Sequence, residues 1–276
     1  MKLIKPSTEI IPQQEGLLGV YKQIELAGRV AYKSEDKITN DSAEKFVNML
    51  IERKHYRPLE FGTIYLKLPT NINPEKICFY DSNHWSRWTN DDEYYYVTTN
   101  ARVIVENELQ DDLKYICEPE DQHYRRITAR IISSRGIIDE ARTHIAFSHL
   151  AESTRYCNYS KDRFDNNVSF IIPRELNIEP GIYSISDLNF GKDIPMKFKT
   201  LLQSYSDAEH NYFHLLNAEG FAPQDARNVL PLGVKSELMM CGYKDDWDHF
   251  FAIRCDVAAH PDMQLIANEL KEKICR

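Results

Sequence analysis

Apolar residues recur at helical spacing in four parts of the chain. Between Ser42 and Arg53 they form one stripe, which predicts a helix with Ser42 as its N-terminal cap. The same period predicts helices over Met196–Ala218, Asp246–Val257 and Pro261–Lys273. Glycine and proline mark Phe190–Pro195, which is expected to be a loop.

Other segments carry strand patterns or mixed signals. Thr63–Leu68 alternates between apolar and polar residues and is expected to be a strand. Tyr94–Val105 is rich in β-branched and aromatic residues, which favours a hairpin or one strand with a bulge. Gln122–Ala151 shows a helical pattern interrupted at Ser133–Gly136, so two successive helices are expected. The predicted class is α+β, in a single domain over residues 1–276, because no repeat or linker divides the chain.

Composition narrows the functional classes. Hydrophobic residues make up 42% of the 276 residues, enough for a sizeable core. The net charge of −8 argues against a broad nucleic-acid-binding surface but allows a local arginine cluster for one phosphate. No run of about 18 apolar residues is present and Met1–Gln14 lacks the apolar core of a signal peptide, so a cytoplasmic protein without a membrane partner is expected. A small-molecule partner is therefore favoured.

Metal and disulfide chemistry find little support. The six cysteines include no Cys-x-x-Cys pair, which argues against a zinc knuckle or a disulfide framework. His144 and His149 lack a convincing set of further metal ligands nearby in sequence. No metal site is predicted.

The segment from Arg142 to Tyr156 is the most informative, because polar residues continue through a pattern interpreted as helical. One interpretation is an ordinary capped helix end, with Ser153 and Thr154 bonding local backbone and Arg155 solvated. The other is a binding segment. Forked arginine donors and short hydroxyl donors together suit one phosphate group.

Several motifs favour the second interpretation. Thr143-His144-Ile145, seven residues and then Ser153-Thr154-Arg155-Tyr156 resemble the Arg-His-Arg, seven residues, Ser signature of the flavin-dependent thymidylate synthases. Four further segments, in the family's order, are similar to its other motifs: Ala27-Gly28-Arg29 with Tyr32, His55-x-x-Pro58-Leu59-Glu60, Pro223 to Pro231 around Arg227, and Trp247-x-His249-Phe250-x-x-x-Arg254.

The resemblance implies a set of site residues. Glu140, Glu152, Ser153, Thr154, Arg155, Arg227 and Arg254 would bind the nucleotide, with Arg254 also polarising the pyrimidine ring as the catalytic residue. Ser153, Thr154 and Arg155 would come from one subunit and Arg227 from another. For Glu140 a solvated helix face is an equal alternative. The flavin would contact His55, Arg57, Thr143, His144, Ile145, Tyr243 and His249.

The chain also departs from the family pattern, mainly at flavin contacts. Thr143 and Ile145 stand where the signature has arginines, and Arg142 is not expected to replace Thr143 because one helical residue turns a side chain by about 100°. Phe61 replaces a histidine and Asp245 an arginine. Either FAD is held by other groups, including Arg57 and Lys244, or FAD binding is weakened or lost.

The resemblance implies a twisted, mainly antiparallel sheet flanked by helices, in a homotetramer with active sites between subunits. The implied reaction is methylation of dUMP to dTMP with methylenetetrahydrofolate, FAD and NADPH. Two alternatives stay open. The enzyme could hydroxymethylate dUMP or dCMP at C5 without flavin hydride, or the protein could be a non-catalytic nucleotide sensor.

Overall fold

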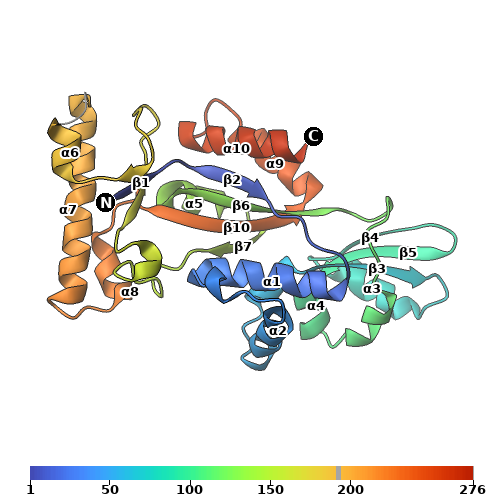
Figure 1. Cartoon of the computed structure of the whole chain (residues 1–276). Helices are drawn as coiled ribbons and strands as arrows, with labels where there is room; N and C mark the ends of the chain where they lie inside the picture. Colours follow the sequence, from blue (N-terminus) through green and yellow to red (C-terminus); the bar gives the residue numbers. More distant parts are fainter. Residues whose placement is uncertain (191–193, 276) are drawn as a thin grey trace.

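A four-stranded antiparallel sheet forms the centre of the molecule (Figure 1). The computed structural model describes residues 1–190 and 194–275. The strand order is β2 (Ser7–Ile10), β6 (Arg126–Ser134), β10 (Lys235–Tyr243) and β7 (Ser148–Ala151). The short strand β7 lies at one edge of this sheet, paired with β10 alone.

Helices cover both faces of the central sheet (Figure 1). On one face lie α5 (Arg135–Ala141), α9 (Lys244–Arg254) and α10 (Pro261–Ile274), and on the other α1 (Gly16–Tyr32), with α2 (Ser42–Glu52) packed beneath it. Alternate residues of β10 serve the two faces. Leu238 and Met240 pack against α9 and α10, whereas Met239 and Cys241 pack against Ala27 and Val30 of α1. This double burial holds β10 between two helical layers.

Two smaller sheets extend the molecule at its ends. One has the order β3 (Thr63–Pro69), β5 (Tyr94–Asn100) and β4 (Arg87–Asn90), with α3 (Pro74–Ser82) and α4 (Ala101–Glu106) beside it. The other joins β8 (Ser169–Ile171), β1 (Lys2–Ile4) and β9 (Gly181–Ile182), near α6 (Ile185–Phe190), α7 (Met196–Asn217) and α8 (Pro223–Ala226). Of all the strand pairs, only β1 and β8 run parallel among the described residues.

The α+β class with mainly antiparallel sheets and flanking helices is confirmed, with the strands divided among three sheets. The helices expected over residues 42–53, 196–218, 246–257 and 261–273 correspond to α2, α7, α9 and α10, and the strand expected over 63–68 is β3. Ser42 is not a helix cap: it is the first residue of α2, and its hydroxyl accepts the Thr39 N–H. The single-domain assignment stays a prediction.

Two other expectations were wrong. Gln122–Ala151 is not a pair of helices but strand β6, helix α5 and strand β7, because Ile127, Ala129 and Ile131 face the core at a spacing of two. Tyr94–Val105 is neither a hairpin nor one bulged strand: only Tyr94–Asn100 is a strand, and a helix follows it. Its strand ends at Asn100, whose side-chain oxygen accepts the Val103 N–H and caps α4.

Two further expectations concern the loop before α7 and membrane-spanning helices. In the loop expected over 190–195, residues 191–193 lie outside the described residues, and Phe190 ends α6. Within the described residues no helix combines the length and the apolar character that crossing a bilayer requires.

Candidate active site

Four arginines from three parts of the chain surround the free edge of β7. Together with residues of β7 and the segment that follows, they line a hollow of about 390 Å³. The lining residues are Arg57, Arg135, Arg142, His149, Leu150, Ala151, Glu152, Ser153, Thr154 and Arg227. The lining therefore places several guanidinium donors around one small space.

Local structure positions each arginine. Arg57 lies on the 3-10 turn Arg57–Phe61 and donates from Nε to the His149 carbonyl at 3.4 Å. Arg135 begins α5 and donates to the Glu152 carbonyl at 3.3 Å. Arg227 donates to Thr154 Oγ1 at 3.1 Å. These bonds to the edge of β7 and the residues after it leave most guanidinium donors unused.

The positive charge of the hollow is only slightly compensated. In the part of the chain that the structure describes, Arg57, Arg135 and Arg227 form no ion pair, and Arg142 pairs at 3.3 Å with Asp139, which is half exposed. Glu152, the one acid in the lining, is buried and already bound by Lys235 at 2.6 Å. The hollow therefore has the character of an anion site.

His149 adds a polar group without a partner. It is 8% exposed, and its Nε2 has no hydrogen-bond partner among the described residues. Burial, followed by the charges of Arg57 and Arg142, lowers the pKa of His149 to about 4. The imidazole is thus neutral at pH 7.

A buried network of charged residues adjoins the hollow and shares Glu152 with it. Glu237 of β10 is 1% exposed and binds Lys33 at 2.8 Å, Lys235 at 2.9 Å and Arg130. Lys235 also forms an ion pair with Glu152, and Glu152 accepts a hydrogen bond from the Tyr159 hydroxyl at 3.1 Å. The network ties the C-terminal end of α1 to the residues just after β7.

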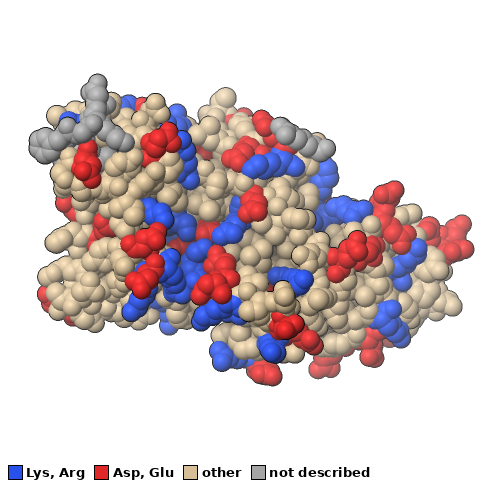
Figure 2. Space-filling model, viewed as in Figure 1, with Lys and Arg blue, Asp and Glu red and all other residues tan. Residues whose placement is uncertain are grey.

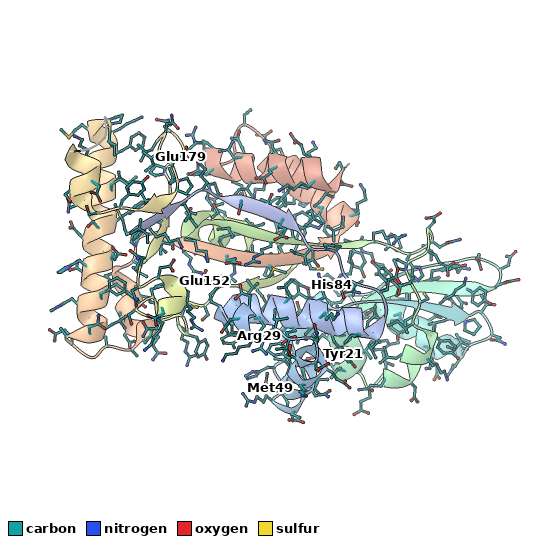
Figure 3. The ribbon with its side chains drawn as sticks, viewed as in Figure 1. Tyr21, Arg29, Met49, His84, Glu152 and Glu179 are labelled. Atoms are coloured by element: carbon teal, nitrogen blue, oxygen red, sulfur yellow. The ribbon has the colours of Figure 1, made fainter. Side chains whose placement is uncertain are left out.

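A larger groove of about 1110 Å³ adjoins the hollow and shares Arg57, Leu150, Ala151 and Ser153 with it. It runs between α1, α2 and the segment after β7; Arg29 and Met49, labelled on α1 and α2 in Figure 3, both line it. Figure 2 shows Lys and Arg side chains, mixed with acids, around the C-terminal end of α1. The groove has room for a nucleoside or a cofactor ring beside the hollow.

Arg254, the last residue of α9, belongs to a different cluster and contacts the turn that follows α5. Its Nε donates to His144 Nε2 at 2.8 Å, and its Nη2 donates to Thr143 Oγ1 at 3.0 Å and the Glu140 carbonyl at 3.2 Å. Burial and then the charge of Arg254 lower the pKa of His144 to about 4. The neutral imidazole thus accepts a hydrogen bond from the Arg254 guanidinium and fixes its orientation.

The predicted substrate residues divide between these places. Glu152, Ser153, Thr154 and Arg227 line the hollow, whereas Glu140 and Arg254 belong to the other cluster. Arg155 binds Gln224 at 3.1 Å, outside the hollow lining. Arg227 and Thr154 already meet within one chain, so this contact requires no second subunit.

The predicted flavin contacts are more scattered. His55 and Arg57 line the groove, Thr143 and His144 hold Arg254, and the ring of His249 lies 6.4 Å from that of His144. Ile145 is 88% exposed and offers no polar group. Tyr243 stays a predicted flavin contact, although its side chain has other partners. The residue is 5% exposed, and its hydroxyl lies 3.0 Å from the Trp85 carbonyl and 2.9 Å from that of Thr98.

Two departures from the family pattern have a structural context. Asp245, which stands in place of an arginine, is paired with Arg87. Arg142 follows α5 directly, and the chain then turns rather than continuing as a helix, so the argument from helical rotation does not apply to Arg142 and Thr143. Sequence reasoning missed Arg135, Arg142 and His149 as site residues. The two arginines flank α5, but only the strand assignment of β6 and β7 reveals that both face the same edge.

Comparison with known proteins identifies the family of the chain. The sequence model of the family described as thymidylate synthase complementing protein matches residues 122–276, which include Arg135, Arg142, the Ser153 segment, Arg227 and Arg254. The chain belongs to this family.

Individual relatives are distant. A flavin-dependent thymidylate synthase from Synechocystis is 25% identical over 142 residues, which are 51% of this chain and 62% of that protein. A crystal structure of the UMP/dUMP methylase PolB from Streptomyces cacaoi, bound with 5-Br dUMP, covers 99% of this chain and 91% of its own, with 18% identity and a TM-score of 0.45. Both proteins carry names of nucleotide-modifying enzymes.

Proposed function

We propose that the protein is an enzyme that transfers a one-carbon unit to C5 of a pyrimidine deoxynucleotide, converting dUMP to dTMP. The observation that carries the proposal is the arginine hollow at the edge of β7, all of whose lining residues except Arg57 lie in the part of the chain that matches the family. Arg227 and Thr154 would hold the phosphate with Ser153, because guanidinium and hydroxyl donors suit phosphate oxygens. The adjoining groove would receive the sugar and base.

Arg254 has the features of a ring-polarising residue. It is fixed by three hydrogen bonds from its guanidinium and stays charged beside a neutral histidine. A cation held in one orientation stabilises negative charge as it develops on a pyrimidine ring. In this proposal His144 is a positioning residue, since it acts through Arg254.

The carbon donor in the proposal is methylenetetrahydrofolate, with FAD and NADPH as redox cofactors. When bound, reduced flavin supplies hydride. His55 and Arg57 in the groove, and Thr143, His144 and His249 near Arg254, would hold it. Because these groups are separated within one chain, a complete flavin site would combine residues of two copies.

A site shared by two copies requires at least a dimer, and the resemblance to the flavin-dependent thymidylate synthases makes a homotetramer the expected assembly. Light scattering should report a mass about four times the 32.3 kDa of the chain, with chains sharing each site. A monomer that is fully active at all concentrations would contradict the shared site.

A second product is favoured by the altered flavin contacts. Ile145 has no polar side-chain group, and the Tyr243 hydroxyl donates to backbone carbonyls, so neither side chain replaces the charged flavin contacts of the family. If flavin hydride is not delivered, water can add to the exocyclic methylene group on C5 of the pyrimidine and give a hydroxymethyl nucleotide. A nucleotide sensor without catalysis would bind the same ligand and form no product.

Product analysis distinguishes these functions. The purified protein is incubated with dUMP or dCMP, methylenetetrahydrofolate, FAD and NADPH, and the nucleotides are measured by mass spectrometry. We expect dTMP from dUMP, lost when FAD is omitted. A hydroxymethyl nucleotide formed equally without FAD would replace the first proposal by the second, and nucleotide binding without any product would support the sensor.

A further inference from the structure

Glu152, one of the predicted substrate residues, lines the arginine hollow, but each of its polar atoms already has a partner within the chain. We propose that Lys235 is a positioning residue for the nucleotide: it holds Glu152, which aligns the segment Ser153–Thr154 with the phosphate. In the proposed function these two hydroxyls bind the phosphate, so the inference rests on that function. It does not depend on which further groups a second copy supplies.

The partners of Glu152 come from three parts of the chain. Its N–H donates to the Glu237 carbonyl at 2.7 Å, and its own carbonyl accepts a hydrogen bond from the Arg135 guanidinium at 3.3 Å. Its carboxylate accepts from the Tyr159 hydroxyl at 3.1 Å and from the Lys235 ammonium at 2.6 Å. A residue bound at both its main chain and its side chain has little freedom to move, which fixes the start of the segment after β7.

Ser153 and Thr154 follow Glu152 directly. Figure 3 shows Glu152 beside the C-terminal end of α1, where the Ser153 N–H donates to the Ala31 carbonyl at 2.9 Å. Thr154 Oγ1 accepts a hydrogen bond from Arg227 at 3.1 Å. A shift of Glu152 would therefore displace both hydroxyls and the guanidinium that is bonded to one of them. Hydrogen bonds to phosphate weaken steeply when distance and angle depart from their optimum.

Lys235 is the cation on which this arrangement depends. Among the described residues no other cation pairs with the Glu152 carboxylate, and the Lys235 side chain is itself only 14% exposed. Burial lowers the pKa of Lys235, but the charges of Glu152 and Glu237 outweigh burial and raise it, so Lys235 is charged at pH 7. Without this cation a carboxylate that is 1% exposed would lose its counter-ion, and Glu152 is expected to turn toward solvent and carry the main chain with it.

Titration calorimetry with dUMP tests the inference on the natural chain, Lys235→Met and Lys235→Arg. We expect Lys235→Met to bind dUMP about tenfold more weakly, since one misaligned charge-assisted contact is worth about that factor. Lys235→Arg keeps a cation beside Glu152 and should recover most of the affinity.

Lys33→Met is the matched control. The Lys33 side chain is 17% exposed and binds Glu237 at 2.8 Å and Glu35 at 2.6 Å, but in the described part of the chain it forms no bond with Glu152. Both variants remove a cation from the same network, so both should lower the free energy of unfolding in urea. Only Lys235→Met should weaken dUMP binding.

Tyr159→Phe is a milder variant that leaves every charge in place. It removes the hydroxyl that donates to Glu152 and should weaken dUMP binding about threefold. Tyr212 is a buried tyrosine of the same apolar cluster and forms no hydrogen bond with Glu152 among the described residues, so Tyr212→Phe should leave dUMP binding unchanged. If Lys235→Met does not fold, these two variants decide the question.

Unchanged dUMP affinity in folded Lys235→Met, or an equal loss in Lys33→Met, would show that Lys235 only stabilises the fold. A loss that Lys235→Arg does not recover, or equal affinities in the two tyrosine variants, would also overturn the positioning role. Each of these results would leave the proposed function intact. A natural chain that does not bind dUMP would overturn the proposed function as well.

Discussion

The Glu237→Gln variant is expected to lose about 3–5 kcal/mol of unfolding free energy, the typical cost of removing one partner from a buried ion pair. Glu237 is 1% exposed and binds Lys33, Lys235 and Arg130. Glutamine keeps the volume but leaves these partly buried cations without their shared carboxylate. Urea unfolding measures the change. Glu175→Gln, which removes an exposed partner of Lys197, is the control and should leave the transition midpoint unchanged.

The same carboxylate predicts a pH dependence. Burial raises the pKa of Glu237, but Lys235 and Lys33 outweigh burial and lower it to about 2, from 4.5 for an ordinary glutamate. A depressed pKa in the folded state means that the stabilisation is complete above pH 4.5 and is lost as the pH falls from there toward 2. The stability of the natural chain and of Glu237→Gln should therefore converge in acid. If the difference in unfolding free energy between the two proteins were the same at pH 7 and pH 3, the network would not stabilise the charged form of Glu237.

Replacing Arg57 and Arg227 together by alanine should weaken dUMP binding by about a hundredfold or more. Each charge-assisted hydrogen bond is worth about 1.5–3 kcal/mol, and about 1.4 kcal/mol corresponds to a factor of ten. The two side chains line the same hollow, and neither is compensated by a carboxylate among the described residues. Calorimetry on the double variant gives the measurement, and Arg174→Ala serves as the control outside the hollow.

Two further arginines show whether the site extends between copies of the chain. Arg155 and Arg254 lie outside the hollow within one chain, bound to Gln224 and to His144 respectively. A loss of about tenfold in dUMP affinity for Arg155→Ala and Arg254→Ala would require that another copy or a bound cofactor brings them to the ligand. Unchanged affinity in the Arg57 and Arg227 double variant would remove the hollow as the nucleotide site.

Several features of the protein were predictable from the sequence, because they depend on residues that are near neighbours along the chain. Helices α2, α7 and α10 follow from apolar residues at a period of 3.6. Family membership could be inferred because the spacing from Thr143 to Tyr156 is a linear pattern, which the sequence shows without any knowledge of the fold.

The arrangement of the site depended on tertiary structure. The Gln122–Ala151 stretch was misassigned because its strands are stabilised by pairing with β10, about a hundred residues later, and not by local propensity. That pairing places β7 at an edge and brings Arg57, Arg135, Arg142 and Arg227 around it. Tyr243 has a family-like position in sequence, yet packing buries its ring and occupies its hydroxyl. A one-dimensional motif specifies which residue types are present, but strand pairing and burial decide which of them can reach a ligand.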